Sequence, residues 1–288
     1  MTWLTWRQHR GAAAVGAAIL VALATGLLWL GISARAKVRN AGLTACLRTN
    51  ADCSGAFMQL QRQYHWLPPV AASLFALPLL AGMFWGAPLV AREIETGTYR
   101  LVWTQSISRR RWIGTKLALL LAVAATATLA LSMLAVWAFQ PLVPVLGNRF
   151  RGGWFDVQGV VPAAYMLFAF ALGTCMGAIW KRTLPAMATT IVGYAAARIP
   201  THTLRRELLS PSIKTVSGTL ASAPRPWPAG FGPGDWILSQ TPTGVPTFGT
   251  PTSGPPAAIY HYIPAARFWA LQGIESAIFL GLTAALVV

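Results

Sequence analysis

Ionisable side chains are scarce in the apolar parts of the chain, so each one found there is a candidate for chemistry. Glu275 is the one acidic residue inside a predicted membrane-spanning segment. A charge at that depth costs about 2.5–3.5 kcal/mol on insertion scales, so the carboxylate should face protein or water. Gln272 lies one turn earlier on the same helix face and Arg267 two turns earlier. Two interpretations of this polar stripe stay open. Either Glu275 is structural, hydrogen-bonded to another helix or close enough to the interface to stay wet, or Gln272 and Glu275 line the outer half of a polar path through the membrane.

Sequence motifs for catalysis and metal binding are missing. The chain has no G-x-x-x-x-G-K-[ST] phosphate loop, no H-E-x-x-H, no G-x-S-x-G and no Cys/His cluster with metal spacing. Its four histidines are scattered. We therefore predict no catalytic residue, no metal site and no bound cofactor, so any energy from ATP must come through a separate subunit.

Composition sets the class of protein. The 288 residues are 55% hydrophobic and only 10% charged, with a mean hydropathy of +0.52, whereas about a quarter of the residues in a soluble domain are charged. Apolar runs of about 20 residues predict membrane-spanning helices. We expect one all-α transmembrane domain over residues 1–288 with six spans: 11–33, 66–91, 117–139, 157–180, 183–197 and 268–288.

Residues 1–10 precede the first run. Arg7 and Arg10 followed by an apolar stretch resemble a signal peptide, but the run is longer than the 7–15 residues of a typical signal core. Trp3 and Trp6 lie one turn apart, so we predict a short interfacial helix whose arginines meet headgroup phosphates. An unstructured basic leader is the alternative.

Basic residues indicate the orientation in the membrane. The short segments 1–10, 92–116 and 181–183 are denser in Lys and Arg than the longer segments between the other spans, and short loops carry the orientation signal. We therefore place the N-terminus, and with it the C-terminus, in the cytoplasm. The net charge of +16 has no soluble basic domain to carry it, so membrane lipid rather than nucleic acid is the expected counter-charge.

Three segments, 34–65, 140–156 and 198–267, are predicted to lie outside the cell, and two of them carry a further signal. Cys46 and Cys53 fall in the first outer loop, where oxidising conditions permit a disulfide, although close spacing alone does not establish one. The segment 198–267 is rich in Pro, Gly, Ser and Thr, which predicts a long external loop with limited helix. Within it, residues 203–209 read either as a short amphipathic surface helix or as a solvated turn.

The second and fourth predicted spans carry small-x-x-x-small pairs, Gly82/Gly86 and Gly173/Gly177, which allow close helix approach. The second span also contains several prolines that can kink it. In spans this rich in Ala and Gly, the glycine pairs are weak evidence for helix contact. Proline is common in membrane helices, so a purely architectural role of these prolines is the alternative to a change of shape.

The most charged stretch of the chain is Arg92–Lys116, with six Lys or Arg and two Glu in 25 residues. Its pattern Glu93-x-Glu95-x-Gly97-Thr98, followed by a basic cluster and the next span, resembles the permease subunits of type-2 ATP-binding-cassette (ABC) transporters, and actinobacterial multidrug-type permeases look closest. The Trp-rich N-terminal helix, six spans and long external loop before the last span extend the resemblance over the whole chain.

The resemblance implies that residues 92–100 form a short cytoplasmic coupling helix that docks on an ATPase subunit. Its contact residues would be Arg92, Glu93, Glu95, Gly97 and Thr98. Gly97 permits the backbone turn that ends the element. A second contact would come from Lys181 and Arg182 in the link before the fifth span. The alternative is an ordinary positive-inside loop that only fixes orientation.

The implied function is that of a non-enzymatic permease subunit of an ATP-driven exporter that moves an amphipathic or hydrophobic compound by alternating access. The partners implied are a cytoplasmic ABC ATPase, which binds ATP and Mg, and a second permease copy, with a homodimer favoured over a heterodimer. The competing class is an integral-membrane enzyme or a membrane sensor, in which Glu275 or the outer loop would do the work.

Overall fold

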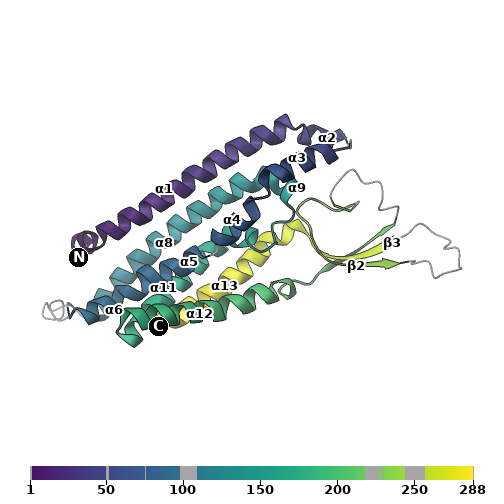
Figure 1. Cartoon of the computed structure of the whole chain (residues 1–288). Helices are drawn as coiled ribbons and strands as arrows, with labels where there is room; N and C mark the ends of the chain where they lie inside the picture. The colour runs from purple at the N-terminus through teal and green to yellow at the C-terminus, as the bar shows by residue number, and fades with distance from the viewer. Residues whose placement is uncertain are drawn as a thin grey trace.

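The computed structural model describes residues 2–49, 52–74, 76–97, 109–217, 227–228, 230–243 and 257–287. It is a bundle of long helices lying side by side, with a small antiparallel sheet at one end (Figure 1). We call this end the sheet end. The opposite end, where α6 meets α12, is called the junction end. The all-helical class is confirmed for the part that crosses the membrane.

The first half of the chain contains α1 (Thr2–Asn40), α2 (Leu43–Thr49), α3 (Ser54–Tyr64), α4 (Leu67–Leu74), α5 (Leu77–Ala81), the π-helix η1 (Gly82–Gly86), α6 (Ala87–Glu95) and α8 (Arg109–Phe139). The short elements η2 (Gln140–Leu142), α9 (Val143–Leu146) and α10 (Trp154–Val157) follow. The second half contains α11 (Val161–Trp180), α12 (Thr183–Leu204), η3 (Arg205–Glu207), β1 (Ser212–Ser217), β2 (Trp236–Thr243), β3 (Ala257–Ile263), η5 (Ala265–Arg267) and α13 (Phe268–Val287).

Five helical segments of the described chain are long and apolar enough to cross a membrane: Ala14–Asn40, Leu67–Glu95, Leu117–Leu146, Val161–Trp180 and Ala265–Val287. They make the chain a multi-pass membrane protein. The remaining expected span, residues 183–197, falls within the 22-residue α12, which also carries Arg198 and His202. A sixth crossing therefore stays a prediction.

The N-terminal segment differs from the expectation of a separate interfacial helix. Residues 2–10 are the first turns of α1, which continues without interruption to Asn40. Gly11 could end a helix, but no proline follows it and the Ala12-Ala13-Ala14 run has high helix propensity, so the helix continues into the apolar run. At 1.5 Å per residue, α1 is about 58 Å long and exceeds the thickness of the hydrocarbon core.

The second span is broken into α4, α5, η1 and α6. Pro78 and Pro88 lie in the first turns of α5 and α6, where a residue without a backbone N–H fits best. The π-helical turn Gly82–Gly86 between them faces α11. A methyl group on Gly82, Gly173 or Gly177 would overlap a backbone carbonyl oxygen of the facing helix. The two glycine pairs therefore meet, and they allow backbone-to-backbone contact.

The segment between α12 and α13 corrects the expectation of an external loop with limited helix. It forms a three-stranded sheet of order β1-β3-β2, in which Tyr262 of β3 lies opposite Ser212 of β1 and Ile237 of β2. Tyr260 is buried against Phe231 in an edge-to-face contact of 4.9 Å between ring centres. Residues 198–204 belong to α12, and the proposed surface helix at 203–209 is instead its last turn and η3.

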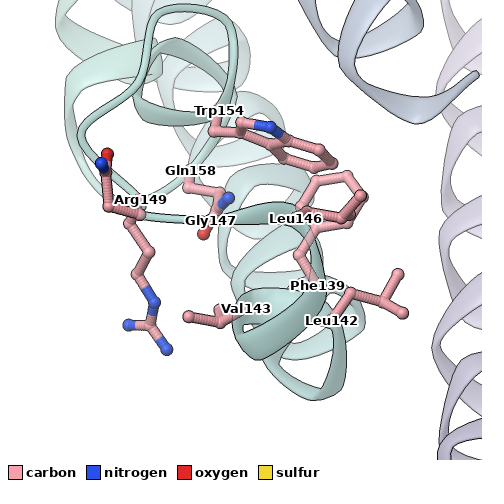
Figure 2. Close-up of a pocket in the computed structure, with 9 residues that line it drawn as sticks. Phe139, Leu142, Val143, Leu146, Gly147, Arg149, Trp154 and Gln158 are labelled. Carbon is pink, nitrogen blue, oxygen red and sulfur yellow. The ribbon is translucent and has the colours of Figure 1, made fainter. Parts of the chain in front are cut away.

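The chain between α8 and α11 folds back at the sheet end. Gly147, with φ +92°, ends α9, and α9 and the following loop line a small cavity between Phe139, Arg149, Trp154 and Gln158 (Figure 2). About 10 Å³ of this cavity is accessible to the centre of a water molecule, which is room for one water.

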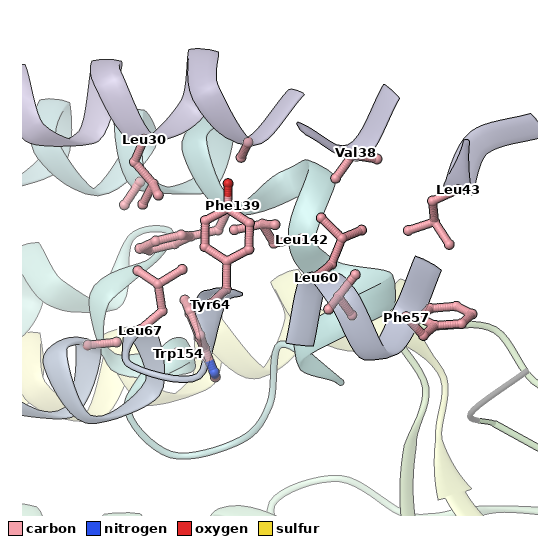
Figure 3. Close-up of a cluster of buried hydrophobic side chains, with 14 of the residues drawn as sticks. Leu30, Val38, Leu43, Phe57, Leu60, Tyr64, Leu67, Phe139, Leu142 and Trp154 are labelled. Atoms are coloured by element: carbon pink, nitrogen blue, oxygen red, sulfur yellow. The ribbon is translucent and has the colours of Figure 1, made fainter. Parts of the chain in front are cut away.

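A compact apolar cluster joins α1, α3, α4 and α8 at the same end, and Leu30, Leu60, Tyr64 and Phe139 lie at its centre (Figure 3). The Cys46–Cys53 disulfide, with a Cα–Cα distance of 5.8 Å, connects α2 to the start of α3 beside this cluster. The short helices α2 and α3 thus pack into an apolar core that they share with the sheet-end parts of the long helices.

Candidate coupling junction and buried ionic cluster

The helix α6 carries the predicted coupling residues at its C-terminus. Arg92, Glu93 and Glu95 form its last turn, and Gly97 follows in the left-handed conformation, with φ +68°. Only glycine adopts this conformation without steric cost. Residues 92–95 are therefore the end of the second span rather than a separate coupling helix. Thr98 and the rest of the proposed helix up to residue 100 lie outside the described residues.

Glu95 joins α6 to the start of α12. Its carboxylate accepts a hydrogen bond of 3.0 Å from the backbone N–H of Thr183 and one of 2.6 Å from the Thr183 hydroxyl. The preceding residue Arg182 gives α12 no side-chain cap. Since unpaired N–H groups and the helix dipole both favour an anion at a helix N-terminus, Glu95 supplies the cap from another helix.

The link between α11 and α12 consists of the two predicted basic residues. Lys181, with φ 55°, ends α11 and donates its backbone N–H to Gly177 at 3.1 Å. Arg182 is extended, and both side chains are exposed. The structure therefore brings the two predicted contact segments, 92–97 and 181–183, together at the junction end.

At the other end of α12 lies a group of four buried charged side chains. Arg198 contacts Asp156 at 3.0 Å and Glu275 at 3.1 Å. Arg205 contacts Asp156 at 2.5 Å and Glu275 at 3.0 Å. Tyr165 donates its hydroxyl to Glu275. We call these five residues the ionic cluster.

The ionic cluster contains two positive and two negative side chains, and each of the four is at most 3% exposed. The guanidinium of Arg198 stacks 3.9 Å from the Tyr165 ring centre, and that of Arg205 lies 4.1 Å from the Phe155 ring centre. Charges at this depth are tolerated only when they are paired and hydrogen-bonded. The cluster meets this condition by balancing its charges.

Burial and charge act in opposite directions on Asp156, which lies just outside the predicted span. Burial disfavours its charged form, but the guanidinium groups of Arg205 and Arg198 outweigh this effect, so the pKa of Asp156 lies below its ordinary value. The aspartate is therefore ionised at neutral pH and completes the charge balance.

Gln272, which was expected on a translocation path, contacts the start of α11. Its side-chain oxygen accepts hydrogen bonds from the backbone N–H groups of Val160 at 3.0 Å and Val161 at 2.9 Å, and its amide donates to the carbonyl of Phe155 at 3.1 Å. Gln272 and Glu275 are both fully buried. Their partners here match the structural alternative, and a role in a translocation path remains a proposal.

Sequence reasoning missed three members of the ionic cluster: Asp156, Tyr165 and Arg205. Asp156 follows two aromatic residues, and Arg205 stands in a segment that looked like a surface helix. A usable signal existed, because a buried Glu275 and a nearby Arg198 each require a partner of opposite charge. Which residue supplies that partner depends on contacts over 49–77 residues of chain, which one sequence does not reveal.

The described residues show no metal centre. They contain no group of three or more His, Cys, Asp or Glu side chains that could hold a metal ion. The cavity beside Trp154 is far below the 300–1,000 Å³ of a typical small-molecule site.

Comparison with known proteins identifies the family. Residues 17–206, about two thirds of the chain, match the family described as ABC-2 membrane transporter related. The match covers α6, α8, α11, α12 and the junction between them. No curated protein and no solved structure matches the chain. The chain therefore belongs to the ABC-2 membrane transporter related family, whose permeases are non-catalytic membrane components that work, in general, with an ATPase subunit.

Proposed function

We propose that this chain is the membrane-spanning subunit of an ATP-driven exporter and that a separate ATPase subunit docks on its junction end. The observation that carries the proposal is the pair of hydrogen bonds from Thr183 to Glu95. These bonds fasten together the two segments that the family resemblance assigns to motor contact. A motor that binds there would act on α6 and α12 at once.

The charges of the junction end suit such a partner. Arg92, Lys181 and Arg182 are exposed beside Glu95, and Glu93 is half-buried. Mixed charges on a rigid helix end can form ion pairs with a soluble protein and fix the direction in which it docks. In this proposal the junction end lies in the cytoplasm and the sheet end lies outside the cell, where the Cys46–Cys53 disulfide would be stable.

Two permease copies and two ATPase copies form the proposed working unit. The central path would lie between the permeases, since the cavity beside Trp154 is too small for an amphipathic compound and the larger hollow, of about 470 Å³, lies on the open surface of α3 beside Met58 and Arg62. Apolar side chains on the outer face of α12, including Leu184, Val192 and Ile199, are exposed in the single chain. Lipid, the second copy or an apolar substrate would cover them.

The test is affinity purification of the detergent-solubilised protein from its native host, followed by mass spectrometry and an ATPase assay. We expect an ATPase subunit to co-purify. The double variant Glu93→Lys/Glu95→Lys should lose it. A matched control is Glu207→Lys, which makes one substitution of the same kind at an exposed position of the sheet end and should retain the ATPase.

Two outcomes would contradict the proposal. One is reproducible purification of the intact permease without any ATPase. The other is loss of the ATPase in the Glu207→Lys control but not in the double variant, because this would put the docking surface at the sheet end.

A further inference from the structure

The helix α12 is fastened to the rest of the protein by polar contacts at both of its ends. At its first residue, Thr183 donates two hydrogen bonds to Glu95. In its last turns, Arg198 forms ion pairs with Asp156 and Glu275. Arg205, in η3 directly after α12, forms ion pairs with the same two carboxylates. A 22-residue helix is about 33 Å long, so α12 runs without a break from the coupling junction to the ionic cluster.

Between these ends, α12 packs through small and apolar groups. Gly193 lies against the side chain of Leu172 on α11, and Ala186 is fully buried. The hydroxyls of Thr189 and Thr190 bond to carbonyls of α12 itself. Side chains without directional cross-helix bonds can slide by small amounts, as in shear motions of packed helices. Among the described contacts of α12 with other elements, the directional polar ones therefore lie at its two ends.

We propose that α12 transmits movement at the coupling junction to the ionic cluster, and that Arg198 and Arg205 act as positioning residues which hold the sheet ends of α11 and α13 until α12 moves. The proposal rests on the proposed function for the source of the movement. The mechanical link itself is a property of this chain and is tested without an ATPase.

The composition of the cluster suits a contact that is made and broken during a cycle. A buried ion pair adds little stability over apolar residues of the same size, but breaking one leaves uncompensated charges and is strongly unfavourable. Such a group is stable when fully assembled and unstable when half assembled. It therefore favours two discrete positions of α12 over a continuous range.

The cluster joins α10, α11 and α13. Under the proposed export by alternating access, these elements would have to separate for the protein to open at the sheet end. Glu275 belongs to α13, Tyr165 to α11 and Asp156 to α10, and Arg205 bridges Asp156 and Glu275. Just beyond, Arg267 donates to the carbonyl of Ser210 at 2.5 Å, which ties the start of α13 to the chain that leads into β1. Movement of α12 would therefore change the positions of α11, α13 and the sheet together.

The experiment measures access to the cluster while the junction is altered. Ser276 adjoins Glu275 and is 8% exposed, so Ser276→Cys is a conservative reporter; Cys175→Ala removes the free cysteine. The permease alone, in lipid nanodiscs, is treated with a charged methanethiosulfonate reagent. Glu95→Ala and Thr183→Val each weaken the junction. We expect each to raise the labelling rate of the reporter about fivefold or more, the lower range of allosteric coupling.

Two controls separate coupling from general loosening. Thr189→Val removes a hydroxyl of α12 that bonds only within its own helix and should leave the rate unchanged. Ser33→Cys places the same reporter on α1, and its labelling rate should not respond to the junction variants. The second measurement is amide hydrogen exchange of residues 204–208 in the parent chain, which keeps its three cysteines. Glu95→Ala in this chain should raise the exchange rate of these residues.

An unchanged labelling rate at Ser276→Cys together with unchanged exchange at residues 204–208 would overturn the proposal. An equal rise at Ser33→Cys would also overturn it, because the bundle would then be loosening as a whole. Since no ATPase is present, these results are independent of whether the proposed motor binds.

Discussion

Glu95 and Thr183 lie 88 residues apart in the chain, and the carboxylate of one caps the helix that begins at the other. This contact makes the end of the second span and the start of α12 one unit. The family's permeases work, in general, with an ATPase subunit. Under the proposed function, this unit is the part of the chain on which such a subunit would act.

The first prediction concerns the Thr183 hydroxyl. Thr183→Val keeps the backbone N–H bond to Glu95 but removes the hydroxyl bond, whereas Thr183→Ser keeps both. We expect Thr183→Val to lower the ATPase activity of the purified complex several-fold and Thr183→Ser to match the parent protein. Equal activities of the Val and Ser variants would show that the hydroxyl bond has no part in coupling.

The second prediction concerns the ionic cluster. Glu275→Ala leaves Arg198 and Arg205 with one carboxylate between them, and removal of one partner from a buried ion pair costs about 3–5 kcal/mol. Thermal unfolding in detergent should show a large loss of stability. The double variant Glu275→Gln/Arg198→Gln restores the charge balance and should recover part of this loss. The single variants Glu275→Gln and Arg198→Gln complete the comparison. If the double variant loses more stability than the two single variants lose together, charge balance is not what stabilises the cluster.

The third prediction concerns the glycine contact between α11 and the second span. Gly173→Ala puts a methyl group against backbone atoms of Gly82 and Ala87, and overpacking of this kind costs about 1–3 kcal/mol. The control is Gly281→Ala on α13, where nothing lies within 4 Å of the added carbon and the helix should gain slightly. Equal stability of the two variants, measured by thermal unfolding, would contradict the close approach.

Much of the fold could be predicted from the sequence because the bilayer imposes a simple rule. Uncharged runs of about 20 residues become helices, and this rule located five spans. The sheet was missed because its strands are short and separated by Pro- and Gly-rich stretches, so no hairpin signal connects Ile213, Ile237 and Tyr260. The continuous α1 was missed because Trp3, Trp6, Arg7 and Arg10 suit an interfacial helix equally well.

The two candidate sites differ in how many of their residues could be predicted from the sequence. At the junction, Glu95 and Lys181 follow from a family motif and from charges at span ends. What the sequence does not contain is their distance in space, since the Glu95–Thr183 contact is set by how α6 and α12 pack. In the ionic cluster, Glu275 is conspicuous by its charge, whereas Asp156 looks like an ordinary loop residue.

The fourth prediction is a pH dependence. The pKa of Asp156 is lower in the folded protein than its ordinary value of about 3.9. Its contribution to stability is therefore complete above about pH 4 and is lost as the pH falls through the folded pKa. Thermal unfolding of the parent protein and of Asp156→Asn should differ by a constant amount from pH 7 to pH 5, and the difference should shrink below about pH 4. A difference that already shrinks near pH 6 would contradict this assignment.

The most direct test of the central claim is photo-cross-linking in living cells of the native host. A photoreactive amino acid is placed at Lys181, an exposed position of the junction end, or at Met58, an exposed position near the sheet end. If an ATPase docks on the junction end, the position-181 variant should form a covalent product with an ABC ATPase subunit and the position-58 variant should form none. An ATPase product from position 58, or none from position 181 in correctly inserted protein, would contradict it.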